Sequence, residues 1–66
     1  MQITVNGEKQ ALDSQVTVSE LLAKLGIDPE TVVIERNLEI LGRADHNETV
    51  IEEGDSIEII RMVDGG

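Results

Sequence analysis

The chain of 66 residues ends in two glycines, Gly65 and Gly66, and this end carries the clearest chemical signal in the sequence. Glycine has no side chain, so an extended diglycine can enter a channel too narrow for other residues and present its carboxylate there. A carboxylate is a poor electrophile at neutral pH, so acyl chemistry at Gly66 requires activation, most simply as an acyl-adenylate formed with ATP in a partner's site. The pattern indicates a protein substrate rather than an enzyme. A mobile chain end or a cloning remnant is the alternative.

The other residues that can do chemistry do not form a recognisable site in the sequence. His46 is the only histidine. No second histidine or serine nucleophile completes a hydrolase constellation, so we interpret His46 as a solvated surface residue. Acidic residues of the segment 52–58 lack the spacing of a twelve-residue calcium loop, and we interpret them as solvated charge. These residues are Glu52, Glu53, Asp55 and Glu58. We therefore predict no catalytic residue and no metal site.

Cysteine is absent from the sequence. There can be no disulfide, no thiolate metal site and no cysteine nucleophile. The glycine-rich motifs that hold ATP or a dinucleotide are also absent from the sequence. We therefore predict no bound cofactor, and any ATP used for activation must be bound by a partner.

Acidic residues outnumber basic ones by 14 to 5, giving a formal net charge of -9. This charge repels phosphate backbones and anionic lipid headgroups, so we predict no role on nucleic acid or at a membrane surface. The acidity serves solubility, steering toward a basic partner groove, or both. No apolar run reaches the roughly 18 to 20 residues of a membrane span, and the N-terminus does not resemble a signal peptide. We expect a cytoplasmic protein that is monomeric by itself.

The N-terminal half of the sequence predicts a hairpin followed by a helix. Residues 2–5 alternate polar and apolar side chains and lead into Asn6-Gly7, a strong hairpin signal, with a returning strand from about Lys9 to Asp13. Residues 17–20 have the T-x-x-E form of a capping box, which begins a helix. The apolar stripe of that helix is Val18, Leu21, Leu22 and Leu25, and Gly26 is placed to end it.

The C-terminal half predicts further strands. Asp28-Pro29 marks a turn, and the β-branched run Thr31–Ile34 after it reads as a strand that Asn37 ends. Residues 39–41 and 49–51 are short extended candidates, and residues 42–47 are irregular with a possible turn of 3₁₀ helix. After the turn at 53–55, residues 56–63 form the longest strand candidate.

Alternation in that last strand sends Ile57 and Ile59 to one face and Ile60 and Met62 to the other. An exposed aliphatic pair beside the chain end would suit contact with a partner. The alternative, left open by the sequence, is that the helix or a loop covers this pair.

The order of hairpin, helix and further strands predicts an α+β fold, in which one helix lies across a mixed sheet of four to five strands. At this length only one domain and one small core are possible. We assign residues 1–63 to the domain and residues 64–66 to a flexible C-terminal tail.

The chain resembles the ThiS family of thiamine-pathway sulfur carriers, relatives of ubiquitin and of the molybdopterin synthase small subunit. The resemblance covers nearly the whole chain and rests on the segments 1–7, 16–22, 32–41 and 53–60 ahead of the closing diglycine. It implies a β-grasp fold. It also implies that Gly66 is adenylated by an enzyme like those that activate ubiquitin, and that sulfur from a cysteine desulfurase relay converts it to a thiocarboxylate, which donates sulfur to thiazole synthase.

This sequence departs from the family pattern at its end. The family usually ends in an aromatic residue, a valine and three glycines, whereas here Met62-Val63-Asp64 precede only Gly65 and Gly66. An unpaired buried carboxylate is strongly disfavoured, so Asp64 predicts a basic group in the partner channel. The alternatives to a thiamine role are a sulfur carrier for molybdopterin or another product, a ubiquitin-like modifier that joins Gly66 to a lysine, and an interaction domain with an inert tail.

Overall fold

The structure is a computed structural model, and it describes residues 1–62. In this part of the chain there are five strands, one α-helix and two short 3₁₀ helices. Their bounds in chain order are β1 (Gln2–Val5), β2 (Glu8–Ala11), α1 (Val18–Leu25), η1 (Pro29–Thr31), β3 (Val32–Arg36), β4 (Glu39–Leu41), η2 (Arg43–Asp45) and β5 (Ser56–Arg61).

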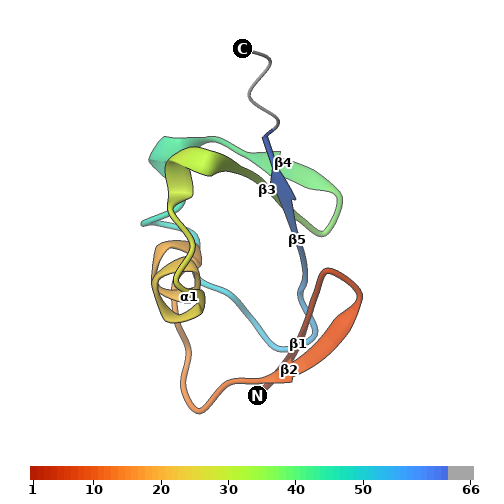
Figure 1. The fold of residues 1–66 in the computed structure, drawn as a ribbon. Helices are drawn as coiled ribbons and strands as arrows, with labels where there is room; N and C mark the ends of the chain where they lie inside the picture. The colour runs from red at the N-terminus through yellow and green to blue at the C-terminus, as the bar shows by residue number, and fades with distance from the viewer. Residues whose placement is uncertain (63–66) are drawn as a thin grey trace.

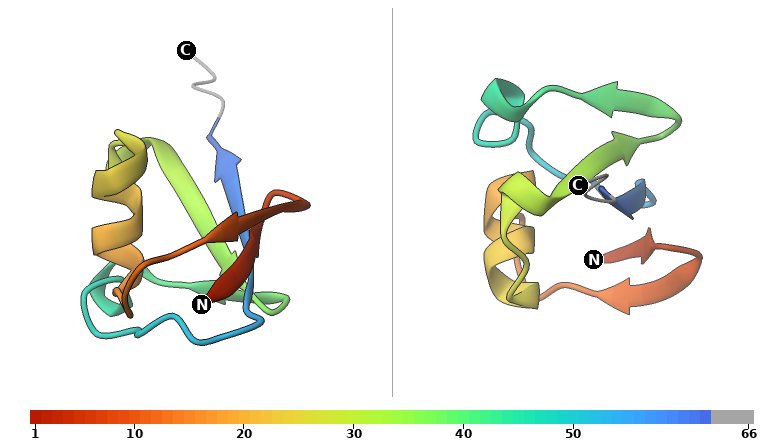
Figure 2. Two further views of the ribbon diagram at one scale, coloured as in Figure 1. Left: turned by 90° about the horizontal axis from the view of Figure 1, so that it is seen from below. Right: turned by 45° about the horizontal axis from the view of Figure 1, so that its top comes forward.

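The strands form one mixed sheet in the order β2-β1-β5-β3-β4. Strand β5 runs parallel to β1 and antiparallel to β3, and the two outer pairs are antiparallel hairpins. Helix α1 covers one face of this sheet, as two views of the ribbon show (Figure 1, Figure 2). The predicted α+β architecture with one helix across a mixed sheet is confirmed.

Helix α1 begins and ends where the sequence predicts. The Thr17 hydroxyl accepts a hydrogen bond from Glu20 N at 3.1 Å, and the Glu20 carboxylate accepts one from Thr17 N at 2.8 Å. Two backbone donors at the helix start are thereby satisfied. Gly26 follows the last turn at φ 71°, a left-handed conformation that costs glycine little. These two ends confine the helix to eight residues.

The core is built entirely from aliphatic side chains, because the sequence has no aromatic residue. Its buried members come from the inward side of the strands, from α1 and from two connecting segments. They are Ile3, Val5, Leu12, Val18, Leu21, Leu22, Val32, Ile34, Ile51 and Ile57. Such a core relies on close interlocking of branched side chains rather than on the large buried area of aromatic rings.

Residues 49–51 do not form the strand that their sequence suggested. The segment makes one isolated bridge, between Thr17 and Val50. Val18 N donates to Thr49 O at 3.0 Å, and Ile51 N donates to Val16 O at 2.9 Å, so the backbone pairs with the entry to α1. Its apolar character reflects the burial of Ile51, whose side chain is fully enclosed in the core.

Three strand boundaries also differ from the expected ones. The returning strand of the first hairpin is Glu8–Ala11, because Asn6 and Gly7 both have positive φ and form a tight two-residue turn. Strand β3 starts at Val32, because Pro29 begins a 3₁₀ turn that Asp28 caps. Strand β5 ends at Arg61, and the predicted end at residue 63 lies outside the described residues.

Among residues 1–62, no helix has the length and apolar character that a membrane crossing requires.

Truncating a core leucine should destabilise the protein far more than truncating an exposed one. Leu21 is 1% exposed and Leu38 is 89% exposed, so Leu21→Ala and Leu38→Ala remove the same atoms from opposite environments. We expect Leu21→Ala to lower the free energy of unfolding by about 2 to 5 kcal/mol. For Leu38→Ala we expect a change within about 0.5 kcal/mol. Urea unfolding of both variants measures the difference, and equal losses would contradict the described core.

Candidate functional site

The chain leaves the sheet from its central strand. After β5 ends, Met62 N donates a hydrogen bond to Thr31 O at 2.9 Å, which extends the β3–β5 pairing by one step. Met62 is therefore held beside Thr31 of η1. Strand β5 ends on the side of the molecule opposite the one on which it begins (Figure 1). The site residues that the sequence predicts, Asp64, Gly65 and Gly66, lie outside the described residues. The structure describes the chain up to Met62, shortly before these residues.

The two faces of β5 have different environments. Ile57 is fully buried and Ile59 packs against the core, on the face that α1 covers. Ile60 is 44% exposed and Met62 is 50% exposed, on the opposite face. Among residues 1–62, therefore, neither the helix nor a loop covers the Ile60 and Met62 pair, which decides between the two alternatives that the sequence left open.

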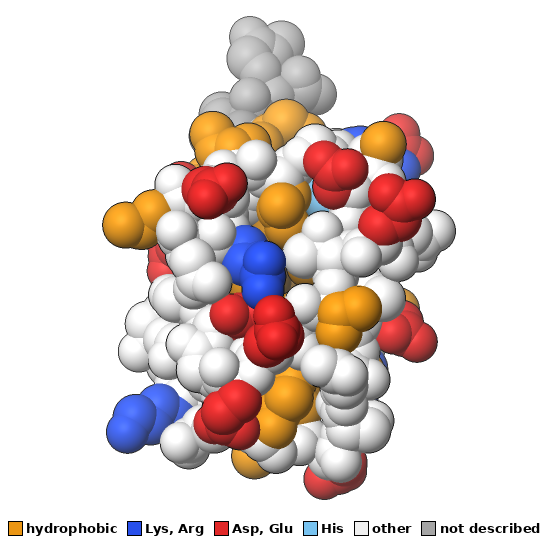
Figure 3. Space-filling model, turned by 180° about the vertical axis from the view of Figure 1, so that it is seen from behind, with side chains coloured by type: hydrophobic (Ala, Val, Ile, Leu, Met, Phe, Trp, Pro, Cys, Tyr) orange, Lys and Arg blue, Asp and Glu red, His pale blue; other side chains and the backbone are white. Residues whose placement is uncertain are grey.

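A groove of about 290 Å³ lies beside Met62. It lies along the first residues of β3, which β4 does not pair with. Most of the side chains that line it are aliphatic. The lining residues are Pro29, Glu30, Val32, Val33, Ile40, Leu41, Arg43, His46 and Met62. Hydrophobic side chains are visible at this end of the molecule next to the end of the described chain (Figure 3). Apolar contact area is therefore available directly beside the root of the C-terminal segment.

The interpretation of His46 as a solvated surface residue is wrong. Its side chain is only 4% exposed, and its Nδ1 has no hydrogen-bond partner among residues 1–62. The physical reason is the contact of its loop with α1, because Ser19 N donates to His46 O at 3.1 Å and holds the loop against the helix start. No periodicity around residue 46 indicates this contact, which is formed between segments far apart in the sequence.

The interpretation of Asp55 as part of a solvated charge run is also wrong. Asp55 is buried, and its carboxylate accepts from Arg36 Nε at 2.8 Å, from the Asn37 amide at 3.0 Å and from Glu52 N at 2.9 Å. Arg36 also lies 3.4 Å from the exposed carboxylate of Glu52. This cluster joins the turn before β5 to the end of β3 and so holds β5 in its register.

The hydrogen bonds of this cluster set the ionisation of Asp55. Burial by itself would raise the pKa of Asp55, but hydrogen bonds from Glu52 N, Asn37 and Arg36 and the charge of the guanidinium outweigh burial and lower it. The hydrogen bond to Asp55 correspondingly raises the pKa of Arg36. The remaining acidic residues of the run, Glu53 and Glu58, are exposed. Within residues 1–62 no three His, Asp or Glu side chains are grouped as metal ligands.

A five-stranded mixed sheet, one helix across it and a central last strand that precedes a C-terminal diglycine together define a small ubiquitin-like protein of the β-grasp type. The crystal structure of the thiamine biosynthesis protein (ThiS) from Geobacter metallireducens has this architecture. It matches the chain with a TM-score of 0.89 and 35% identity, covering 100% of both chains.

The sequence comparisons agree with the fold. The ThiS family model matches residues 2–66, and the chain belongs to the ThiS family. The sulfur carrier protein ThiS of Bacillus subtilis is 38% identical over 50 residues, which are 76% of each protein. The thiazole synthases of Paramagnetospirillum magneticum and Magnetococcus marinus are each 36% identical over 66 residues. The chain spans only 20% of the length of these two synthases.

Replacing Asp55 by asparagine should destabilise the protein in a pH-dependent manner. We expect Asp55→Asn to lower the free energy of unfolding by about 1 to 3 kcal/mol at pH 7, because a charged hydrogen-bond acceptor is lost. The lowered pKa of Asp55 means that its contribution is present above the unfolded-state pKa of about 3.9 and is lost as the pH falls through the folded-state value.

Urea unfolding from neutral pH to about pH 2 tests this expectation. The gap between wild type and Asp55→Asn should narrow as the pH falls below about 5, since the Asp55 carboxyl is protonated first in the unfolded chain, and it should close once the folded carboxyl is protonated as well. Asp13→Asn is the matched control, because Asp13 is exposed and none of the described hydrogen bonds involves its carboxylate. A gap that stays constant over the whole pH range would contradict the role given to the Asp55 carboxylate.

Proposed function

We propose that this chain is a sulfur carrier for thiazole formation in thiamine biosynthesis, with Gly66 as the residue that carries sulfur. The observation that supports it most is the ThiS family match, which extends through the terminal diglycine to residue 66. The described fold also supports this proposal. Strand β5 lies at the centre of the sheet, and the hydrogen bond from Met62 N to Thr31 O fixes the residue from which the C-terminal segment follows. The protein is a co-substrate in this proposal, and its partners are the catalysts.

The chemistry at Gly66 proceeds in two proposed steps. An oxygen of the Gly66 carboxylate attacks the α-phosphorus of ATP, pyrophosphate leaves, and the carbonyl carbon becomes electrophilic as an acyl-adenylate. In the second step the terminal sulfur of a cysteine persulfide on a partner, supplied through a cysteine desulfurase relay, attacks the carbonyl carbon and displaces AMP, and a second thiol of the partner then reduces the resulting acyl disulfide, which leaves the thiocarboxylate and a partner disulfide. No side chain of the carrier takes part in either step. This accounts for a sulfur-handling chain without cysteine, since the sulfur is held on the C-terminal carbonyl carbon.

Two enzymes meet the carrier in this scheme. A ubiquitin-activating-enzyme-like adenylyltransferase (ThiF-like) binds the ATP, and a thiazole synthase (ThiG-like) receives the sulfur. Support for the second partner comes from the two relatives named thiazole synthase, in which a segment similar to this chain is part of a longer protein. Joining two units in one chain raises their effective concentration for each other, as expected for partners.

The C-terminal residues have separate roles in this proposed function. Residues 1–63 are the folded domain, residues 64–66 are the tail that enters the partner channel, and Ile60 and Met62 contact the partner beside that channel. Asp64 needs a basic group in the channel, because burying an unpaired carboxylate is costly. We propose that the carrier acts in the cytoplasm, where ATP for this activation is present.

Intact mass spectrometry of the protein with its natural C-terminus tests the function. After incubation with ATP, a sulfur donor and the adenylating enzyme, we expect the mass increase that replacement of one oxygen by sulfur produces. Fragmentation should place the change at Gly66. If the C-terminus instead becomes joined to a lysine of another protein, or stays unchanged with active enzymes, the carrier proposal is wrong.

Substituting the terminal glycine should impair activation without affecting the fold. We expect Gly66→Ala to reduce kcat/KM for adenylation by about 100-fold, since a small misplacement of the reacting group has effects of this size. Deletion of Gly65 and Gly66 should abolish it. Gly42→Ala is the matched control, because a Cβ at Gly42 meets only the Asp45 Oδ2 atom, at an ordinary 3.7 Å. Adenylation that survives the deletion would contradict the assignment of Gly66.

A further inference from the structure

The pairing of β3 with β5 stops at a half-formed pair. Val32 lies opposite Arg61, so the same register places Thr31 opposite Met62. Hydrogen-bonded pairs of antiparallel strands exchange two bonds, one in each direction. Met62 N donates to Thr31 O at 2.9 Å, but Thr31 N donates to Asp28 O at 3.0 Å. Within residues 1–62, therefore, Thr31 returns no bond to Met62 O, and the pairing ends there.

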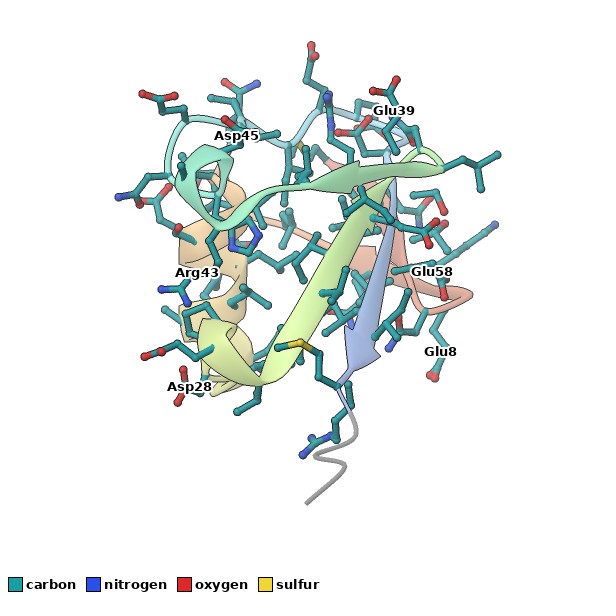
Figure 4. All side chains as sticks on the ribbon, turned by 90° about the horizontal axis from the view of Figure 1, so that it is seen from above. Glu8, Asp28, Glu39, Arg43, Asp45 and Glu58 are labelled. Atoms are coloured by element: carbon teal, nitrogen blue, oxygen red, sulfur yellow. The ribbon has the colours of Figure 1, made fainter. Side chains whose placement is uncertain are left out.

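The turn that takes the Thr31 N–H consists of Asp28 and the residues of η1. Asp28 Oδ1 accepts from Glu30 N at 2.9 Å, and Thr31 Oγ1 donates to Asp28 O at 2.7 Å. Pro29 favours this turn because its ring fixes its own φ and keeps the residue before it extended, as Asp28 is at φ -73° and ψ 119°. Asp28 lies at the same end of the molecule as the last residues of β5 (Figure 4). Neighbouring residues alone thus specify the turn.

Pro29 also prevents the next pair from forming. Hydrogen-bonded pairs recur every two residues along antiparallel strands. One such step beyond Thr31 and Met62, the register would place Asp64 opposite Pro29. Proline has no N–H and cannot donate to the carbonyl of an opposite residue. The segment before β3 therefore stops the sheet in two ways, by a turn that uses the Thr31 N–H and by a residue without a donor.

We infer that the turn Asp28–Thr31 is a positioning element for the proposed reaction, because it ends the sheet at Met62 and so sets how far Gly66 can reach. Four residues follow Met62 in the sequence, and fully extended they span about 13 to 14 Å. Two further residues in the sheet would halve this reach. This inference rests on the proposed function, since it assigns the residues that determine the distance from the domain to the reacting carboxylate.

Adenylation of full-length variants tests the inference. The double variant Asp28→Val/Pro29→Val removes the cap, supplies an N–H at position 29 and favours a longer β3 that pairs with Asp64. We expect its kcat/KM to fall more than about tenfold, because the reacting group is misplaced. Asp28→Val alone alters an exposed residue and should give a smaller loss of the same kind.

Two further variants separate capping from charge. Asp28→Asn keeps an oxygen that accepts from Glu30 N, so its kcat/KM should stay within about twofold of wild type. Asp13→Val is the matched control for the new apolar side chain, because Asp13 is exposed and none of the described hydrogen bonds involves its carboxylate. A loss in Asp28→Asn equal to that in Asp28→Val would overturn the inference, as would wild-type kcat/KM in the double variant.

A change of chain length separates positioning from a purely structural role. Two glycines inserted between Asp64 and Gly65 restore the lost reach, so they should recover most of the kcat/KM of the double variant. The same insertion in the wild-type chain should bring no increase. A double variant that is folded by urea unfolding, yet gains nothing from the insertion, would overturn the inference.

Amide hydrogen exchange measured by NMR tests the pairing without any partner. We expect the Asp64 N–H to exchange more slowly in the double variant than in wild type, because it then donates to the carbonyl of residue 29. Equal exchange rates would overturn the inference. Slower exchange in the double variant, together with a wild-type chain that the active enzyme does not adenylate, would overturn the proposed function and support the role of the turn in ending the sheet.

Discussion

Strand β5 is the last element of the described chain, yet it lies at the centre of the sheet, between β1 and β3. Its parallel pairing with β1 and its antiparallel pairing with β3 join two hairpins that have no ladder between them. The side chain of Ile57 at its start is fully buried, so the strand is also anchored in the core. The position of every other strand, and of the residue from which the tail follows, depends on this pairing.

The register of β5 is held at its start by polar contacts rather than by packing alone. Asp55 binds Arg36 and Asn37 from the end of β3, and Ser56 N donates to the Asn37 side chain at 2.9 Å. A one-residue shift of β5 would exchange its two faces and bring Ile60 toward the core. The charged cluster around Asp55 therefore specifies one register for β5, in a core that has no aromatic rings.

The carrier chemistry requires little of the carrier beyond presentation. The proposed steps at Gly66 use ATP, a sulfur nucleophile and enzyme side chains, so the chain itself needs only to present its tail and the surfaces that partners contact. The sheet separates these demands, because α1 and the core occupy one face while the opposite face is open beside the chain end. Buried and exposed side chains thus lie on opposite sides of the same strands, as the adjacent residues Ile57 and Glu58 show.

Local signals in the sequence were sufficient to predict those elements whose ends depend on only a few neighbouring residues. The hairpin turn at Asn6-Gly7, the capping box of Thr17 and Glu20 and the glycine end of α1 are all present as predicted, because positive φ and short-range hydrogen bonds decide them. The family resemblance and the diglycine were likewise readable from the sequence. Alternation in β5 separated Ile57 from Ile60 correctly, since the period of a strand is independent of its partners.

Tertiary structure decided what depends on contacts between distant segments. The burial of Asp55 and His46 follows from Arg36 and from the start of α1, and neither contact leaves a periodic trace in the sequence. Residues 49–51 have the side chains of a strand but pair with the entry to α1, and this pairing brings the side chain of Ile51 into the core. The exposure of Ile60 and Met62 and the point at which β3 and β5 cease to pair required the register of the sheet, which only long-range pairing defines.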